Sequence, residues 1–188
     1  MLLSSQVSMG RSKLQLIIEI AIFAALAFVF SLIRLYRMPQ GGSINLEMLP
    51  ILVIALRRGP STGVVTGVLF GILSSFLDSY IVHPIQFLTD YPLAFGAIGL
   101  AGIFSNQLHS NISKNKNTII PIVSAVLTAF IGRTAFHTIS GIVFFGSGEV
   151  GLNAINISLG YNLTYMVPTS IICAIILMIL PKNFFTVK

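Results

Sequence analysis

The sequence predicts an all-α membrane protein: a single domain over residues 1–188, built as a bundle of six transmembrane helices. Composition is the first indication, because 55% of the 188 residues are hydrophobic, only 9% are charged, and the mean hydropathy is +0.93. Soluble domains carry about 25% charged residues. The second indication is the pattern: apolar runs, several close to the roughly 20 residues that a helix needs to cross a bilayer, alternate with polar segments.

The first predicted span covers Leu14 to Ile33. Glu19 lies in its first turns, where a carboxylate either reaches the membrane interface or pairs with a neighbouring cation. Ala21 and Ala25 stand four residues apart, and therefore on one helix face. Small residues at this spacing let another helix approach closely within lipid. The partner of this face is either another helix of the same chain or a different protein.

A polar loop from Tyr36 to Asn45 follows, with the helix breakers Pro39, Gly41 and Gly42. It is longer than a tight turn needs, so it is either a connector or a lid over a pocket. Span two, Leu46 to Leu56, is short and contains Pro50, which predicts a compressed or broken helix.

Span three covers Ser61 to Leu77 and carries Gly63, Gly67 and Gly71 at four-residue spacing. The pattern predicts a groove of bare backbone for close helix packing. Three longer units follow along the chain. Span four covers 84–104, span five 118–145 and span six 154–180, with polar connections at 106–117 and 146–153.

The distribution of cations predicts the orientation. Six spans place both termini on one side of the membrane, together with the loops at 57–58 and 114–116. That side holds Arg11, Lys13, Arg57, Arg58, Lys114, Lys116, Lys182 and Lys188, against Arg34 and Arg37 on the other. Both termini are therefore expected in the cytoplasm, and the polar residues within the spans are expected near the outer face.

Several chemistries are not indicated. The chain has no Gly-Lys pair for a phosphate-binding loop, no His-Glu-x-x-His, no Gly-x-Ser-x-Gly and no Cys/His cluster. Its one cysteine, Cys173, cannot form an internal disulfide. The net charge of +6 lies in loops and not on a basic face with aromatic residues, as nucleic-acid binding requires. We therefore expect no enzyme, no metal or other cofactor, and no nucleic-acid partner.

Polar and aromatic side chains within the spans form a candidate ligand site. Asp90 stands out, because an ionisable residue at bilayer depth costs free energy and indicates function. A carboxylate with aromatic ring faces suits an organic cation that carries a flat ring. Arg133 is expected to bond helix-end carbonyls or a carboxylate. The other candidates, each with packing or an internal hydrogen bond as its ordinary role, are Tyr80, Tyr91, Phe144, Phe145, His137 and Asn162.

Four sequence blocks occur in an order found in one membrane-protein family. They are Glu-Ile-Ala-Ile-Phe-Ala-Ala-Leu-Ala at 19–27, Met-Leu-Pro-Ile-Leu-Val-Ile-Ala-Leu-Arg-Arg-Gly at 48–59, Asp-Tyr-Pro-Leu-Ala-Phe at 90–95 and Phe-His-Thr-Ile-Ser-Gly-Ile-Val-Phe-Phe-Gly at 136–146. Together they resemble the thiamine-specific S component of energy-coupling factor (ECF) vitamin transporters. The resemblance implies a substrate-binding subunit in the bacterial plasma membrane that captures thiamine and works with a transmembrane coupling protein and two cytoplasmic ATPases.

The resemblance also implies site residues, position by position. The family's acidic pocket residue, normally Glu, matches Asp90, and the tyrosine after it matches Tyr91. The pocket histidine matches His137, and the asparagine of helix six matches Asn162. An aromatic residue at the entry to span four matches Tyr80.

Gly141, which closes the Phe-His-x-x-x-Gly block, is counted with this site, and Ala21 and Ala25 match the family's docking motif for the coupling protein. Two positions depart from the family. The chain has no tryptophan, so the stacking residue eight positions after the histidine is Phe145. The tyrosine five positions before the asparagine is Ile157.

These departures leave alternatives open. One is an S component for another vitamin or for a thiamine precursor, because Asp90 could bind an aminopyrimidine without any cation. The other is a membrane scaffold with no transport role, whose polar residues pair across helices.

Overall fold

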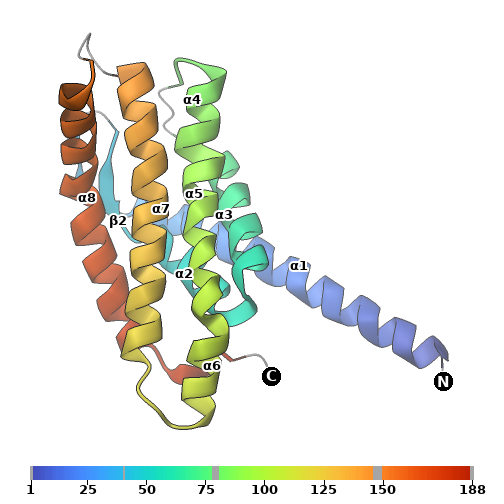
Figure 1. The fold of residues 1–188 in the computed structure, drawn as a ribbon. Helices are drawn as coiled ribbons and strands as arrows, with labels where there is room; N and C mark the ends of the chain where they lie inside the picture. The colour runs from blue at the N-terminus through green and yellow to red at the C-terminus, as the bar shows by residue number, and fades with distance from the viewer. Residues whose placement is uncertain (1, 40, 78–80, 146–149, 187–188) are drawn as a thin grey trace.

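The computed structural model describes residues 2–39, 41–77, 81–145 and 150–186, with side chains from residue 13 onward. It is mainly helical, with the long helices side by side and α1 extending away from the bundle toward the N-terminus (Figure 1). The main helices are α1 (Leu2–Leu32), α2 (Met48–Arg58), α3 (Pro60–Ser74), α4 (Pro84–Leu88), α5 (Ala94–Ile98), α6 (Ser105–Ser113), α7 (Ile119–Phe145) and α8 (Leu152–Ile179).

Four helical segments of the described chain are long and apolar enough to cross a membrane: 13–32, 84–113, 119–145 and 152–179. The expected boundaries of spans one, five and six hold to within a few residues. α3 has 15 residues and α2 has 11, so both are shorter than a full crossing. The structure therefore confirms a mainly helical protein with several helices that can cross a membrane.

Of the two alternatives for span two, the compressed helix is confirmed and the broken one is wrong, because α2 is short but continuous. α2 runs unbroken from Met48 to Arg58, because Pro50 lies in its first turn, where a helix loses no internal hydrogen bond to proline. Every residue from Met48 to Leu56 is buried. A helix surrounded by other helices does not need to match the thickness of the bilayer.

Span four is longer than expected. The helix continues past Phe104 through α6 to Ser113, so most of the predicted polar connection at 106–117 is helical. Leu108 is buried and Ile112 packs beside the core, four residues further on. This pair gives the polar segment one apolar face, which is enough to keep it helical against the bundle.

The glycine groove of α3 is confirmed. A side-chain carbon at Gly67 would meet the Phe95 carbonyl, and one at Gly71 would meet the Tyr91 carbonyl 2.5 Å away. Gly63 lies in the same way against the backbone of Gly99. α3 therefore packs backbone to backbone on the segment 91–102, and this contact fixes where Tyr91 and its neighbours lie.

The loop expected at 36–45 forms most of a short β-hairpin, which adds two strands to a mainly helical structure. Strand β1 (Arg34–Arg37) pairs antiparallel with β2 (Ser43–Asn45). Gly42 N–H donates to the Tyr161 hydroxyl on α8 at 3.1 Å. The breakers at 39, 41 and 42 form the turn of this hairpin and not a free connector.

The opposite end of the bundle is closed by ionic and backbone contacts. Glu19 accepts two hydrogen bonds from Arg58, both 2.7 Å, which confirms the pairing alternative for this carboxylate. Arg57 Nη1 donates to the carbonyls of Phe184 at 3.1 Å and Thr186 at 2.5 Å. These bonds join α1, the end of α2 and the C-terminal segment.

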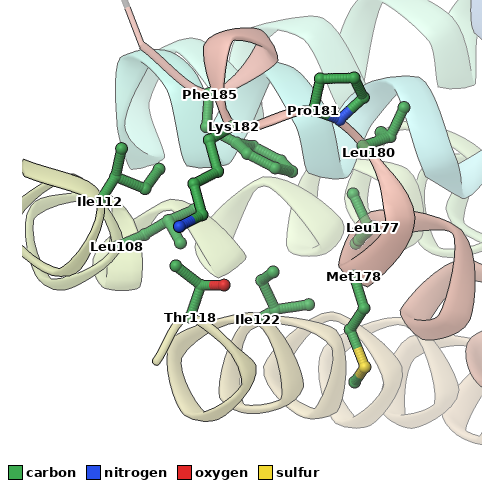
Figure 2. Close-up of a pocket in the computed structure, with 10 residues that line it drawn as sticks. All are labelled: Leu108, Ile112, Thr118, Ile122, Leu177, Met178, Leu180, Pro181, Lys182 and Phe185. Atoms are coloured by element: carbon green, nitrogen blue, oxygen red, sulfur yellow. The ribbon is translucent and has the colours of Figure 1, made fainter. Parts of the chain in front are cut away.

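A small cavity of about 140 Å³ lies at this end, where the C-terminal segment folds back over the ends of α6, α7 and α8 (Figure 2). Aliphatic side chains and the Phe185 ring line most of it, and the Lys182 side chain also lines it and extends toward Leu108 and Thr118. Phe185 is 2% exposed. The ring therefore packs into the hydrophobic core at this end of the bundle.

We predict that Gly67→Ala lowers the stability of the protein in detergent by about 1–3 kcal/mol, the usual cost of overpacking a close contact. The added methyl group meets backbone, which cannot move aside as a side chain can. Gly160→Ala on α8 is the matched control, because nothing lies within 4 Å of its new carbon. Thermal unfolding followed by circular dichroism measures both. Equal melting temperatures for the two variants would contradict the groove.

Candidate ligand-binding site

A cavity of about 690 Å³ lies at the end of the bundle that carries the hairpin. Its volume falls in the range of small-molecule sites, about 300–1,000 Å³. The hairpin, the segment 86–95, α7 and α8 all contribute to its wall. Most of the site residues expected from the sequence line this cavity: Asp90, Tyr91, His137, Gly141, Phe145 and Asn162.

Two further aromatic residues, Tyr80 and Phe144, were expected at the site. Tyr80 lies outside the described residues. Phe144 is not among the residues that line the cavity, and its ring stacks on His83 with 5.3 Å between centres. Among the candidates with described side chains, the structure therefore selects Phe145 over Phe144.

A widened helical turn, Thr89–Leu93, carries Asp90 and Tyr91. Pro92 lies inside it, and because proline has no N–H the regular hydrogen-bond ladder cannot continue there. The result is a π-turn between α4 and α5, a feature frequent at functional sites. Gln86 Nε2 donates to Asp90 Oδ2 at 2.6 Å, and the Tyr91 ring stacks on Phe87 at 5.9 Å.

Asp90 belongs to a hydrogen-bonded chain that crosses the bundle. His137 Nδ1 lies 3.2 Å from Asp90 Oδ1, and Arg133 Nε donates to His137 Nε2 at 3.2 Å. Arg133 Nη2 donates to Glu47 Oε1 at 2.5 Å, and Glu47 Oε2 accepts from Asn45 at 2.9 Å. The carboxylate partner expected for Arg133 is therefore found.

Glu47 is the member of this network that the sequence pattern does not reveal. Its side chain is only 8% exposed, and it lines the cavity. One signal was available, because Glu47 immediately precedes the wholly apolar stretch of α2, where a carboxylate lies close to the hydrocarbon region. The same rule that singles out Asp90 applies to it.

Asn162 is buried and already bonded within α8. Its Nδ2 donates to the Ser158 carbonyl at 2.9 Å, and its Oδ1 accepts from the Tyr165 hydroxyl at 2.5 Å. A primary amide has a second N–H and a second lone pair. These remain for a ligand without disturbing either internal bond.

Gly141 has a packing role in the structure. A side-chain carbon there would collide with Ser158 Oγ, which donates to the Thr138 carbonyl at 2.9 Å. Glycine therefore allows α7 and α8 to approach closely beside the cavity. Phe145 and Ile157, the positions that depart from the family, both line the cavity, and they are 40% and 60% exposed.

The small-residue face of α1 is directed away from the bundle. Ala21 and Ala25 are exposed, whereas Ala24 and Ala27 on the adjacent face are fully buried. Of the two alternatives for this face, packing within the same chain is therefore wrong. The surface is accessible to a second protein.

The arrangement is suited to binding. Within the described residues, no three His, Cys, Asp or Glu side chains gather where they could hold a metal ion. Glu47 and Arg133 balance each other in charge, and the Asp90 carboxylate lines the cavity with the rings of Tyr91 and Phe145 and with the cations Arg34 and Arg37 of β1. A single carboxylate with ring faces can bind an organic cation or an aromatic amine.

The known proteins that are similar to this chain are described as thiamine transporters. The family described as thiamine transporter protein matches residues 17–188. The thiamine transporter ThiT of Bacillus subtilis is 43% identical over 179 residues, which are 92% of this chain and 93% of that protein. The Lacticaseibacillus paracasei ThiT is 26% identical over 184 residues, 92% and 91% of the two chains.

A solved structure of ThiT from Listeria monocytogenes superposes with a TM-score of 0.85. It is 34% identical and covers 94% of this chain and 100% of its own. The match and the apolar helices place the protein in the bacterial plasma membrane as a multi-pass transporter and not an enzyme. The cavity therefore lies in a chain that belongs to the thiamine transporter family.

Proposed function

We propose that this chain is the membrane-embedded thiamine-binding subunit, or S component, of an ECF importer. The observation that carries the proposal is the Asp90 carboxylate, whose side chain is 16% exposed, in a cavity of about 690 Å³ that the rings of Tyr91 and Phe145 also line. Thiamine combines a flat aminopyrimidine with a cationic thiazolium ring. Asp90 supplies an acceptor for the amine and a charge for the cation, and the rings of Tyr91 and Phe145 supply stacking surfaces.

We propose a six-span topology with both termini in the cytoplasm. α2 and α3 supply two spans beside the four long helical segments, α2 as an interior helix. The cations Arg57, Arg58 and Lys182 lie at the end opposite the cavity, as a cytoplasmic face requires. The cavity then opens near the outer face, where thiamine arrives, with the hairpin as its cover.

The proposed partners are a transmembrane coupling protein and two cytoplasmic ATPase subunits. The chain has no phosphate-binding loop, so ATP-driven uptake requires such partners. The exposed face of Ala21 and Ala25 on α1 is the docking surface proposed for the coupling protein. Within lipid, close contact between small residues is what holds two helices together.

A second candidate ligand is the pyrimidine half of thiamine alone. The observation that favours it is the pair Phe145 and Ile157, which offers less ring surface for the thiazolium than the family's aromatic residues. Calorimetric titration with thiamine and with the free aminopyrimidine separates the two. Tighter binding of thiamine supports the proposal, equal binding favours the precursor, and failure of both favours a scaffold.

We predict that Asp90→Asn lowers thiamine affinity about tenfold or more. The substitution preserves shape but removes a charge-assisted bond worth about 1.5–3 kcal/mol in a desolvated site. Asp90→Glu restores the acidic residue usual in the family and should retain most of the affinity. Isothermal titration calorimetry measures both. A wild-type dissociation constant for a folded Asp90→Asn variant would remove Asp90 from the site.

We predict that Phe145→Trp tightens thiamine binding by about 0.5–1 kcal/mol, because tryptophan gives the best cation–π face. The substitution also introduces the only tryptophan of the chain, so quenching of its fluorescence reports binding directly. Phe145→Ala should weaken binding. If neither variant changed the affinity, Phe145 would be a packing residue; weaker binding by the tryptophan variant would favour a ligand other than thiamine.

We predict that Ala21→Trp and Ala25→Trp abolish thiamine uptake by cells while binding by the purified protein stays intact. The added bulk blocks a partner helix but lies on an exposed face whose two alanines do not line the cavity. Leu26→Trp is the control, an exposed position of α1 outside the small-residue row. Equal losses of uptake and binding would mean that the alanine face serves the fold and not a partner.

A further inference from the structure

His137 is held between a guanidinium and a carboxylate. Arg133 lies one turn earlier on α7, with Nε 3.2 Å from His137 Nε2, and the other ring nitrogen lies 3.2 Å from Asp90 Oδ1. The side chains are largely removed from solvent: 7% of Arg133 and 14% of His137 are exposed. Neither contact is therefore readily replaced by bulk water.

These two contacts select one arrangement of protons on the imidazole. A guanidinium nitrogen only donates, so His137 Nε2 must accept and carries no proton. The proton of the neutral ring is then on Nδ1, where it donates to the Asp90 carboxylate. An imidazolium would direct an N–H at the N–H of Arg133. The opposite tautomer would do the same and would leave a lone pair facing Asp90.

Arg133 is itself held on two further sides, so it cannot swing away from the histidine. Its Nη2 donates to Glu47 Oε1 at 2.5 Å, and its guanidinium carbon lies 4.3 Å from the centre of the Phe95 ring. Phe95 also meets His137 edge to face at 6.4 Å. One ring thus supports both members of the pair.

We propose that Glu47 and Arg133 are positioning residues, which hold His137 as the neutral Nδ1–H tautomer and so keep Asp90 an anionic acceptor for the ligand. The inference rests on the proposed function, in which Asp90 receives the amine or the cation. Glu47 and Arg133 cancel in charge and neutral His137 adds none, so the network carries one net negative charge. An imidazolium would cancel that charge in a cavity whose wall also carries the cations Arg34 and Arg37, and would weaken the attraction of Asp90 for a cation.

The tautomer of the wild-type ring is the first test, and it needs no ligand. The chain has three histidines, so His83→Asn with His109→Gln leaves His137 alone; asparagine keeps an acceptor for the Ile85 N–H that His83 now caps. Nitrogen-15 NMR of labelled histidine in lipid nanodiscs at neutral pH should show Nδ1 protonated and Nε2 bare. An imidazolium or an Nε2–H ring would overturn the proposal, whether or not thiamine binds.

The second test separates positioning from packing. Glu47→Gln with Arg133→Met removes both charges together and so leaves no unpaired buried charge. Thiamine affinity should fall about tenfold or more, since the ligand acceptor is no longer held in place, and the His137 spectrum should show mixed tautomers. Arg133→Lys keeps a cationic donor and should recover part of the affinity together with the Nδ1–H signal.

The matched control is Glu19→Gln with Arg58→Met, which removes an ion pair at the opposite end of the bundle. Affinity and spectrum should both stay unchanged. A folded Glu47→Gln/Arg133→Met protein with wild-type affinity and a single Nδ1–H ring would overturn the positioning role. A wild-type protein that binds no thiamine would instead refute the proposed function, and its histidine spectrum would still decide the tautomer.

Discussion

The ion pair between Arg133 and Glu47 is the interaction on which the site depends. A charge buried among membrane-spanning helices is tolerated only with a partner, and removing one member of a buried pair costs about 3–5 kcal/mol. Arg133 on α7 meets Glu47 just before α2, so the pair joins two elements far apart in the sequence. The remaining hydrogen bonds of the network, through His137 to Asp90 and Gln86, extend from this one contact.

Helix packing provides the frame for that network. Lipid gives helices no hydrophobic drive to associate, so close backbone contact has to hold them together. The glycines of α3 supply that contact against the segment 91–102, which begins within the π-turn that carries Asp90. Gly141 does the same between α7 and α8. The cavity lies beside these close contacts, because Tyr91 and Gly141 both line it.

The two ends of the bundle differ in chemistry. One holds the cavity, Asp90 and the hairpin; the other holds Arg57, Arg58 and the C-terminal segment packed around Phe185. α1 contributes to both functions proposed for the chain, ligand capture and partner docking. One of its faces packs on the bundle, and the face with Ala21 and Ala25 is exposed. This division allows ligand capture and partner docking to be changed independently.

The sequence by itself determined the helical membrane class, the approximate limits of the long spans, the glycine groove and the grouping of Asp90, Tyr91, His137, Phe145 and Asn162. These features follow from local hydropathy, residue spacing and the sequence blocks shared with the family, and none of these signals depends on how the helices pack. Tertiary structure alone decided the course of residues 36–45, because a short hairpin is stabilised by what it packs on, here the Tyr161 hydroxyl. It also decided that α2 is an unbroken interior helix and that Glu47 meets Arg133. A buried pair between residues 86 positions apart leaves no periodic signal, since its two halves become neighbours only when the helices pack.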